Sequence, residues 1–199
     1  MEEYLKASYF MDYDSLLVKD RAEELVRSTD HGLERAKRVF YFVRDEIRYN
    51  PYLFSFDAED FIASKTLNRG EGYCVQKAVL LSTLARAVGI PSRLGFATIR
   101  NNLTPEKLVK LMGTNLFVCH GYSELFLEGR WVKATPAFDS KMCQKIGVPA
   151  VEFDGRRDAI LPEYNKKGEL YIEYIRYHGS YSDLPLKRIV EIGMEAYGK

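Results

Sequence analysis

Cys74 has the residue type and the local sequence of a nucleophile. It follows the turn Gly70-Glu71-Gly72-Tyr73 and begins an apolar helical pattern that ends near Val88. A thiol at a helix N-terminus faces unpaired backbone N–H groups and the positive end of the helix dipole, and both favour the thiolate. A buried structural cysteine on the apolar face is the alternative, and for an arbitrary cysteine it is the commoner case. The glycine turn favours a reactive thiol without deciding between the two.

His120 is the candidate base for such a thiol. It follows the apolar run Leu116–Cys119 on a predicted strand, so its ring should be at least partly buried. There it could take the proton of the thiol and later give it to a leaving group, although a neutral core histidine is an equally good interpretation. Adjacent residues of a strand face opposite sides, so Cys119 should point away from a site that contains His120. We expect His31 and His178 at the solvated surface.

Asp139 and Thr135 are the candidates for a third group that would orient the imidazole. They lie at and just beyond the end of the predicted strand 131–135, and both residue types also have ordinary roles in turns and loops. Cys143 has no assignable role. The sequence contains no spacing typical of metal ligands and no Gly-x-x-x-x-Gly-Lys phosphate loop, so we expect no metal and no cofactor.

The apolar periodicity predicts helices first and strands afterwards. Helices are expected at residues 14–28, 33–47, 74–88, 104–113 and 186–197. Strands are expected at 93–100, 116–120, 123–127 and 131–135, with β-rich stretches between 151 and 177. Asp57 should cap a short helical turn, and 64–73 should be a polar connection. This order is typical of an α+β fold with a mostly antiparallel sheet.

Composition excludes several classes of protein. A chain of 199 residues that is 46% apolar with a net charge of +1 suits one folded domain over residues 1–199. The near-zero charge disfavours binding to nucleic acid or to a membrane surface. The longest uncharged stretch, Leu111–Ser123, is shorter than the ~20 residues that a membrane helix needs. Glu2 and Glu3 do not suit a secretory leader, so we expect a soluble, cytoplasmic protein; the sequence leaves its oligomeric state open.

Two blocks of the sequence resemble the transglutaminase-like superfamily. Residues 72–93 show the family's Gly-x-Cys start, its apolar helix and its Arg-Ala-x-Gly-Ile-Pro-x-Arg end. Residues 120–132 resemble the family's His-x-x-x-Glu strand, turn and Trp-Val strand. The likeness covers about 33–140 and leaves 141–199 as a variable extension. It implies a papain-like core, with the nucleophile helix packed on an antiparallel sheet, Cys74 as nucleophile and His120 as base.

The chain departs from the family at the third catalytic position. The family's Asp usually precedes a Pro at the end of the Trp strand, where this chain has Thr135-Pro136, and the nearest acid is Asp139. Three possibilities stay open: Asp139 bends back to His120, Thr135 orients the ring less strongly than a carboxylate would, or the site is degraded.

The resemblance implies an enzyme that acts on amide or peptide bonds through a thioester on Cys74. Its substrate would be a peptide or protein amide, and we favour hydrolysis over cross-linking because nothing in the sequence describes a site for an amine. One alternative is a non-catalytic module that binds a peptide or protein in the former cleft. Another is a coenzyme A-dependent acyl transferase with a Cys-His-Asp site.

Overall fold

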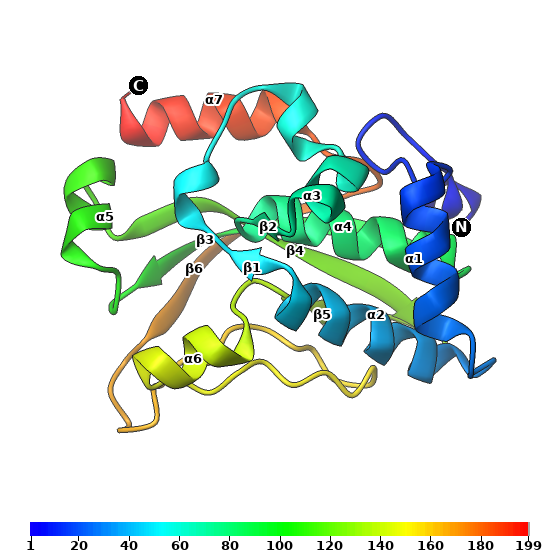
Figure 1. Ribbon diagram of the computed structural model, residues 1–199. Coiled ribbons are helices and arrows are strands. Elements are labelled where there is room, and N and C mark those ends of the chain that lie inside the picture. The colour runs from blue at the N-terminus through cyan, green and yellow to red at the C-terminus, as the bar shows by residue number, and fades with distance from the viewer. Residues whose placement is uncertain (199) are drawn as a thin grey trace.

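The structure is a computed structural model that describes residues 1–198. Its main sheet is antiparallel and has the strand order β5-β4-β3-β6. The strands are β3 (Ser92–Asn101), β4 (Leu116–Leu127), β5 (Arg130–Ala134) and β6 (Ile172–Tyr181). A separate two-stranded parallel sheet joins β1 (Arg48–Tyr49) to β2 (Glu71–Gly72) directly before Cys74. The α+β class and the mostly antiparallel sheet are confirmed (Figure 1).

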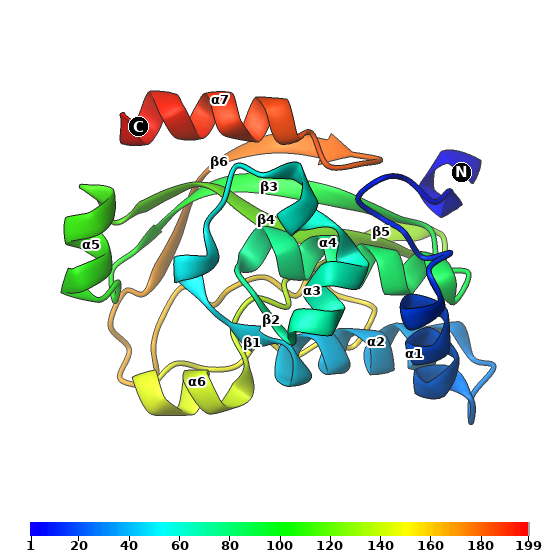
Figure 2. The same cartoon turned by 45° about the horizontal axis from the view of Figure 1, so that its top comes forward.

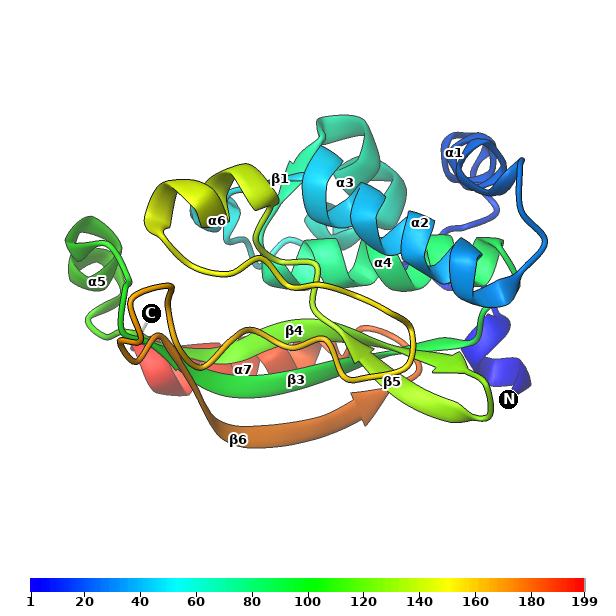
Figure 3. The ribbon, with the colours of Figure 1, turned by 90° about the horizontal axis from the view of Figure 1, so that it is seen from below.

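Seven α-helices and three 3-10 turns complete the described chain. Figure 3 shows α1 to α4 and α6 on one side of the main sheet. Figure 2 shows α7 on the opposite side of that sheet from α4 and α2. The helices are α1 (Leu16–Val26), α2 (Gly32–Glu46), α3 (Ala63–Arg69), α4 (Cys74–Ala87), α5 (Glu106–Met112), α6 (Ser140–Ile146) and α7 (Leu186–Tyr197). The 3-10 turns are η1 (Glu2–Leu5), η2 (Pro51–Leu53) and η3 (Ala58–Phe61).

Helix α4 lies at the centre of the core. Every residue from Cys74 to Arg86 is buried, because strands β3 and β4 pack on one side of the helix and helices α1, α2 and α3 on the other. The sequence pattern indicated a single apolar face, so the burial of the polar positions was not predicted. Gly89 ends the helix in the left-handed region, at φ +80°, where glycine carries no steric penalty.

Two buried cations fix the position of α4. The Nζ atom of Lys77 donates to the carbonyl oxygens of Arg44 and Ile47 at the end of α2, at 3.0 and 2.5 Å. Burial lowers the pKa of Lys77 to about 7, although Asp139 and Asp45 oppose the shift. Near the other end, Arg86 donates to the carbonyl oxygens of Lys6, Ser92 and Ser182. These bonds hold α4 against α2, the N-terminal segment and the main sheet.

Two predicted segments were wrong. Residues 64–73 are not only a polar connection, because α3 and β2 form there; Ala63 and Thr66 are buried, and Gly70 ends the helix at φ +70°. The predicted strands 116–120 and 123–127 are one strand, β4, which continues through Gly121 without a turn. The short helix at 104–113 is confirmed, but Thr104 does not cap it, since its hydroxyl donates to the Asn101 carbonyl.

Gly121 is where β4 comes closest to the start of α4. A Cβ atom there would lie 3.0 Å from Val75 Cα and 3.2 Å from Val75 Cγ2. Because a backbone atom cannot rotate away, β4 or α4 would have to move apart. The absence of a side chain at Gly121 therefore lets β4 pack closely on the first turn of α4, which Cys74 begins.

We expect Gly121→Ala to lower the free energy of unfolding by about 1–3 kcal/mol, because overpacking displaces backbone. Denaturant titration measures this loss. Gly193→Ala is the matched control, because a Cβ atom at Gly193 meets nothing within 4 Å and alanine favours its helix. Equal stability of Gly121→Ala and the wild type would contradict the close packing of β4 on α4.

Candidate active site

Cys74 is the first residue of α4, and a tight turn leads into it. Gln76 stabilises that turn: its Oε1 accepts from Tyr73 N at 3.1 Å, and its Nε2 donates to the Asp60 carbonyl at 3.0 Å. Gly72 leaves room for Gln76, since a Cβ atom at Gly72 would lie 3.1 Å from Gln76 Cβ. The first turn of α4 is therefore held in place by its own Gln76 side chain, and the Cys74 thiol keeps its position at the helix start.

His120 reaches the same region from β4. It pairs with Ala97 of β3, is only 2% exposed, and meets the Tyr174 ring edge-on with the ring centroids 6.2 Å apart. Its Nε2 atom is buried without a hydrogen-bond partner among the described residues. A buried polar atom without a partner costs free energy. Because no hydrogen bond from a described residue to Nε2 fixes the ring, packing holds it in place.

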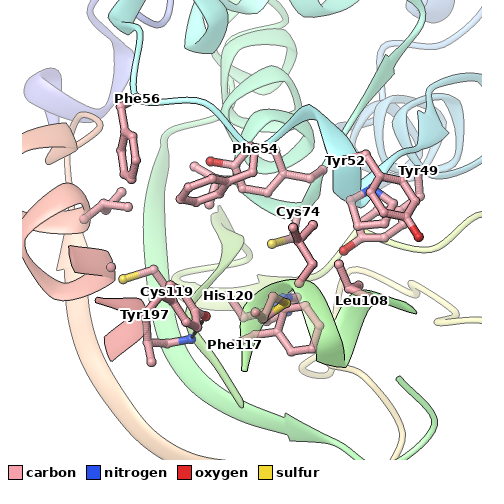
Figure 4. Close-up of a pocket in the computed structure, with 18 residues that line it drawn as sticks. Tyr49, Tyr52, Phe54, Phe56, Cys74, Leu108, Phe117, Cys119, His120 and Tyr197 are labelled. Atoms are coloured by element: carbon pink, nitrogen blue, oxygen red, sulfur yellow. Dashed lines mark hydrogen bonds between the residues drawn. The ribbon is translucent and has the colours of Figure 1, made fainter. Parts of the chain in front are cut away.

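A cavity of about 340 Å³ joins the two residues. Figure 4 shows Cys74, His120 and Cys119 around it, together with aromatic rings from several elements. Its walls come from the segment 49–56, the start of α4, helices α5 and α7, and β4. The lining residues are Tyr49, Pro51, Tyr52, Phe54, Phe56, Tyr73, Cys74, Val75, Leu108, Leu111, Met112, Phe117, Val118, Cys119, His120, Ile189, Gly193 and Tyr197.

The prediction that Cys119 points away from this site was wrong, since Cys119 lines the same cavity as His120. The strand alternation fails at a bulge: Ala97 pairs with His120 but Ile99 pairs with Phe117, so β4 carries one extra residue there. The hydroxyl of Tyr197 accepts from Val118 N, inside the bulge, and donates to the Leu116 carbonyl, both at 3.0 Å. The bulge therefore turns Cys119 into the cavity, and Tyr197 fixes α7 to β4 beside it.

Asp139 and Thr135, the two candidates for orienting the His120 ring, have different surroundings in the structure. Asp139 caps α6, where its Oδ1 accepts from Met142 N at 2.8 Å, and no hydrogen bond or ion pair joins it to His120 within residues 1–198. Thr135 is fully buried after β5, and its hydroxyl lies beside the Tyr174 phenol without a hydrogen bond of normal geometry. Tyr174 thus lies beside both Thr135 and His120. That Asp139 orients the imidazole stays a prediction.

Burial controls the charge of the pair. It raises the pKa of the Cys74 thiol to about 11, although the backbone N–H groups of Gly121, Val75 and Cys74 itself partly oppose the shift. Burial lowers the pKa of His120 to about 4. Desolvation therefore outweighs the helix N–H groups, which by themselves favour the thiolate. In the unliganded protein the pair consists of a neutral thiol and a neutral imidazole near pH 7.

Alkylation tests this charge state. With a thiol pKa of about 11, the rate at which iodoacetamide modifies Cys74 should rise about tenfold per pH unit between pH 7 and pH 10. Peptide mapping reports Cys74 separately from Cys143. The same protein in denaturant is the control, and its rates should level off above the ordinary thiol pKa of about 8.5. A plateau for native Cys74 near or below pH 8 would mean a thiolate–imidazolium pair instead.

The remaining candidates lie outside the cavity. His31 is exposed, as predicted, whereas His178 is half-buried, because its Nε2 lies 2.8 Å from the Thr98 hydroxyl between β3 and β6. Cys143 is buried in α6, with its sulfur near the Phe138 carbonyl. Among the described residues, no group of three or more His, Cys, Asp or Glu side chains could hold a metal ion.

The sequence interpretation missed most of the cavity wall. The sequence patterns indicated no role for the aromatic residues of segment 49–56, yet Tyr52, Phe54 and Phe56 are about half exposed and border the cavity. The available signal was the repetition of large aromatic residues within a few positions around Pro51, outside any predicted helix or strand. The contribution of α7 had no local signal, because only the fold brings it to Cys74.

The fold and the Cys–His site define a papain-like class of α+β protein with a cysteine at the start of the central helix. The profile of the transglutaminase-like superfamily matches residues 19–136, which is more than half of the chain, and the protein belongs to that superfamily. A search of curated proteins finds no match.

The solved structures that are similar to this chain include the following two. One is described as "a Putative Cysteine Protease from Cytophaga hutchinsonii"; it has 19% identity and a TM-score of 0.51 over 67% of this chain and 40% of that one. The other, "a putative protease from Parabacteroides distasonis", has 13% identity and a TM-score of 0.44 over 67% of this chain and 24% of that one. The chain thus spans less than half the length of either, and at these identities the first likeness shows the fold alone.

No helix within residues 1–198 has both the length and the apolar character needed to cross a membrane.

Proposed function

We propose that the protein is a cysteine hydrolase that cleaves an amide or peptide bond through a thioester on Cys74. The observation that carries this proposal is that Cys74 and His120 line one cavity, with the backbone N–H groups of Gly121 and Val75 close enough to the Cys74 sulfur to lower its pKa. A nucleophile and a base within one enclosed site are the minimum that acyl transfer requires. Membership of the transglutaminase-like superfamily supports the same chemistry.

The reaction begins from the neutral pair. His120 takes the thiol proton while the sulfur attacks the carbonyl carbon, and backbone N–H groups at the start of α4 stabilise the oxyanion. The C–N bond then breaks, the amine leaves with the proton from His120, and the acyl group stays on sulfur. In the second half, His120 takes a proton from water, the hydroxide attacks the thioester, and the acid leaves as the thiol is restored.

Turnover of peptide amides tests the proposal, and an added amine distinguishes hydrolysis from cross-linking. A library of quenched peptides should be cleaved with release of a free carboxylate, and a primary amine such as methylamine should divert little of the acyl group. A predominance of amide products would mean cross-linking rather than hydrolysis. No cleavage of any amide or ester, with Cys74 intact, would overturn the proposal.

A non-catalytic binding module is the second candidate. The observation that favours it is that, within residues 1–198, His120 has no carboxylate partner that would stabilise the imidazolium formed during catalysis. A module of this kind would bind its ligand equally well after Cys74→Ala and would show no acylation of the wild type.

We propose that Thr135 occupies the position of the missing orienting acid. Thr135→Asp should raise the pKa of His120 from about 4, because a nearby carboxylate stabilises the imidazolium, and should shift the acid limb of kcat/KM upward by about one pH unit or more. Thr135→Val, which keeps the volume, should leave the limb in place, and thermal unfolding checks that each variant folds. A shift caused by Asp139→Asn and by no Thr135 variant would assign the role to Asp139.

A further inference from the structure

The cavity beside Cys74 contains no charged side chain near pH 7. None of its lining residues is Asp, Glu, Lys or Arg within the described part of the chain. Its titratable groups stay neutral as well: burial raises the pKa of Tyr73 and Tyr49 and raises that of Tyr197 to about 12, while His120 is neutral above about pH 4. A charged group deep in the cavity would lose its hydration without gaining a charged partner from the lining residues, because the Lys107 ammonium lies outside them, over the Tyr52 ring at 5.6 Å from its centroid.

The walls are apolar from three sides. The segment 49–56 supplies aromatic rings, with Phe54 packed against Phe56 at 4.9 Å and against Tyr73 at 6.0 Å between ring centroids. Helix α5 supplies Leu108 and Met112, and α7 supplies Ile189. Exposed aromatic residues gathered at the mouth of one cavity are typical of a surface that binds an apolar ligand.

Gly193 of α7 leaves part of this space open. It lines the cavity and is buried, yet a Cβ atom built on it meets no other atom within 4 Å. Any larger side chain at this position would therefore extend into the cavity. The total volume of about 340 Å³ lies at the lower end of the range for pockets that hold small organic ligands.

We propose that this cavity holds the acyl half of the substrate and selects an uncharged, apolar acyl group of medium length. The inference rests on the proposed chemistry at Cys74, since the sulfur fixes the position of the scissile carbonyl carbon and the rest of the acyl group must then occupy the adjoining space. The acyl chain lies between segment 49–56 and helices α5 and α7, and its distal end approaches Gly193.

Matched p-nitroanilides of acetic, butyric, octanoic and octanedioic acid test the proposal. Each buried methylene is worth a factor of roughly three to four, and the octanoyl and acetyl groups differ by six methylenes, so kcat/KM for the octanoyl substrate should exceed that for the acetyl substrate by roughly 700-fold or more. The octanedioyl monoanilide has the same chain length but ends in a carboxylate. Its kcat/KM should be on the order of 100-fold below that of the octanoyl substrate.

Substitutions at two positions, Gly193 and Met112, locate the acyl group. Gly193→Leu should lower kcat/KM for the octanoyl substrate by about 10-fold or more while changing the acetyl substrate less than about threefold, and Gly193→Ala should lie between. Met112→Lys, at a half-buried position, should reduce the discrimination against the octanedioyl substrate, whereas Met112→Leu should keep it. Ratios of kcat/KM among the substrates that stay the same in all four variants would overturn the placement of the acyl chain.

Ligand binding to the Cys74→Ala variant separates this inference from the proposed function. Calorimetry should show that octanamide binds at least about tenfold more tightly than 8-amino-8-oxooctanoate. Such binding without any turnover by the wild type would keep the apolar acyl site and reject the hydrolase. Turnover at similar rates for all four anilides would keep the hydrolase and reject the acyl site, and failure of octanamide to bind would also reject the site.

Discussion

Cys74→Ala should reduce amide hydrolysis to the uncatalysed background, a loss of roughly 10⁴-fold or more in kcat. The sulfur is the atom that forms the bond to the carbonyl carbon, and neither Cys119 nor Cys143 can replace it: Cys143 is enclosed in α6, and the bulge places Cys119 at another point of the cavity wall. Steady-state kinetics with the octanoyl anilide measure the loss. Cys74→Ser should retain trace activity, because a hydroxyl is a weaker nucleophile in the same position.

Cys143→Ala is the matched control, since it removes a buried thiol outside the cavity. It should keep kcat/KM within about threefold of the wild type and lower only the thermal stability. Residual activity of Cys74→Ala above about 1% of the wild type would mean that another group carries the reaction.

His120→Asn should lower kcat/KM by roughly 10²- to 10⁴-fold, because none of the other described residues that line the cavity is a histidine or a carboxylate that could take the thiol proton. The pH profile distinguishes this loss from a structural effect. In the wild type, a protonated imidazole cannot accept the proton, so kcat/KM should fall below about pH 4 and stay level towards neutral pH. In His120→Asn the rate should instead increase steadily with pH, because thiolate must form without a base.

His178→Asn is the control for this variant, because His178 lies outside the cavity between β3 and β6. It should reproduce the wild-type profile. A level profile at neutral pH in His120→Asn would show that His120 only packs beside the sulfur.

The helices and most of the sheet could be predicted because their signals are local. The apolar spacing and Gly89 define α4, and the last helix matches the prediction from Leu186 to Tyr197. Helix α3 was missed because only Ala63 and Thr66 of its seven residues are buried, which leaves too weak a periodicity to recognise.

The features of the site that could not be predicted depend on contacts between distant segments. The bulge at Val118 and Cys119 arises from the register between β3 and β4, and strand alternation alone gives the opposite orientation for Cys119. The neutral state of Cys74 follows from burial by α7, β4 and segment 49–56, whereas the sequence shows only the helix terminus that favours thiolate. The sequence could therefore single out the two candidate residues, which stay predictions, but it could not show how burial shifts their pKa values.

Departure from the superfamily pattern at Thr135 bears directly on catalysis. On the proposal that Thr135 occupies the orienting position, a carboxylate there would stabilise the imidazolium, whereas a hydroxyl leaves Cys74 and His120 neutral until substrate binds. An apolar acyl group in the cavity would exclude water from the sulfur and the ring, so the proton transfer would take place in a medium of low dielectric constant. An apolar cavity therefore suits a reaction in which the Cys74 thiol and the His120 imidazole are both neutral until the sulfur attacks the carbonyl carbon.

Intact-protein mass spectrometry of the acyl-enzyme tests the central claim most directly. The wild type is mixed with the p-nitrophenyl ester of octanoic acid for less than one turnover and quenched in acid. The intact mass is then measured, and peptide mapping locates the modified residue. We predict one octanoyl group on Cys74, formed faster than in His120→Asn and absent from Cys74→Ala. Acylation at another residue, or equal rates of Cys74 acylation with and without His120, would contradict the account.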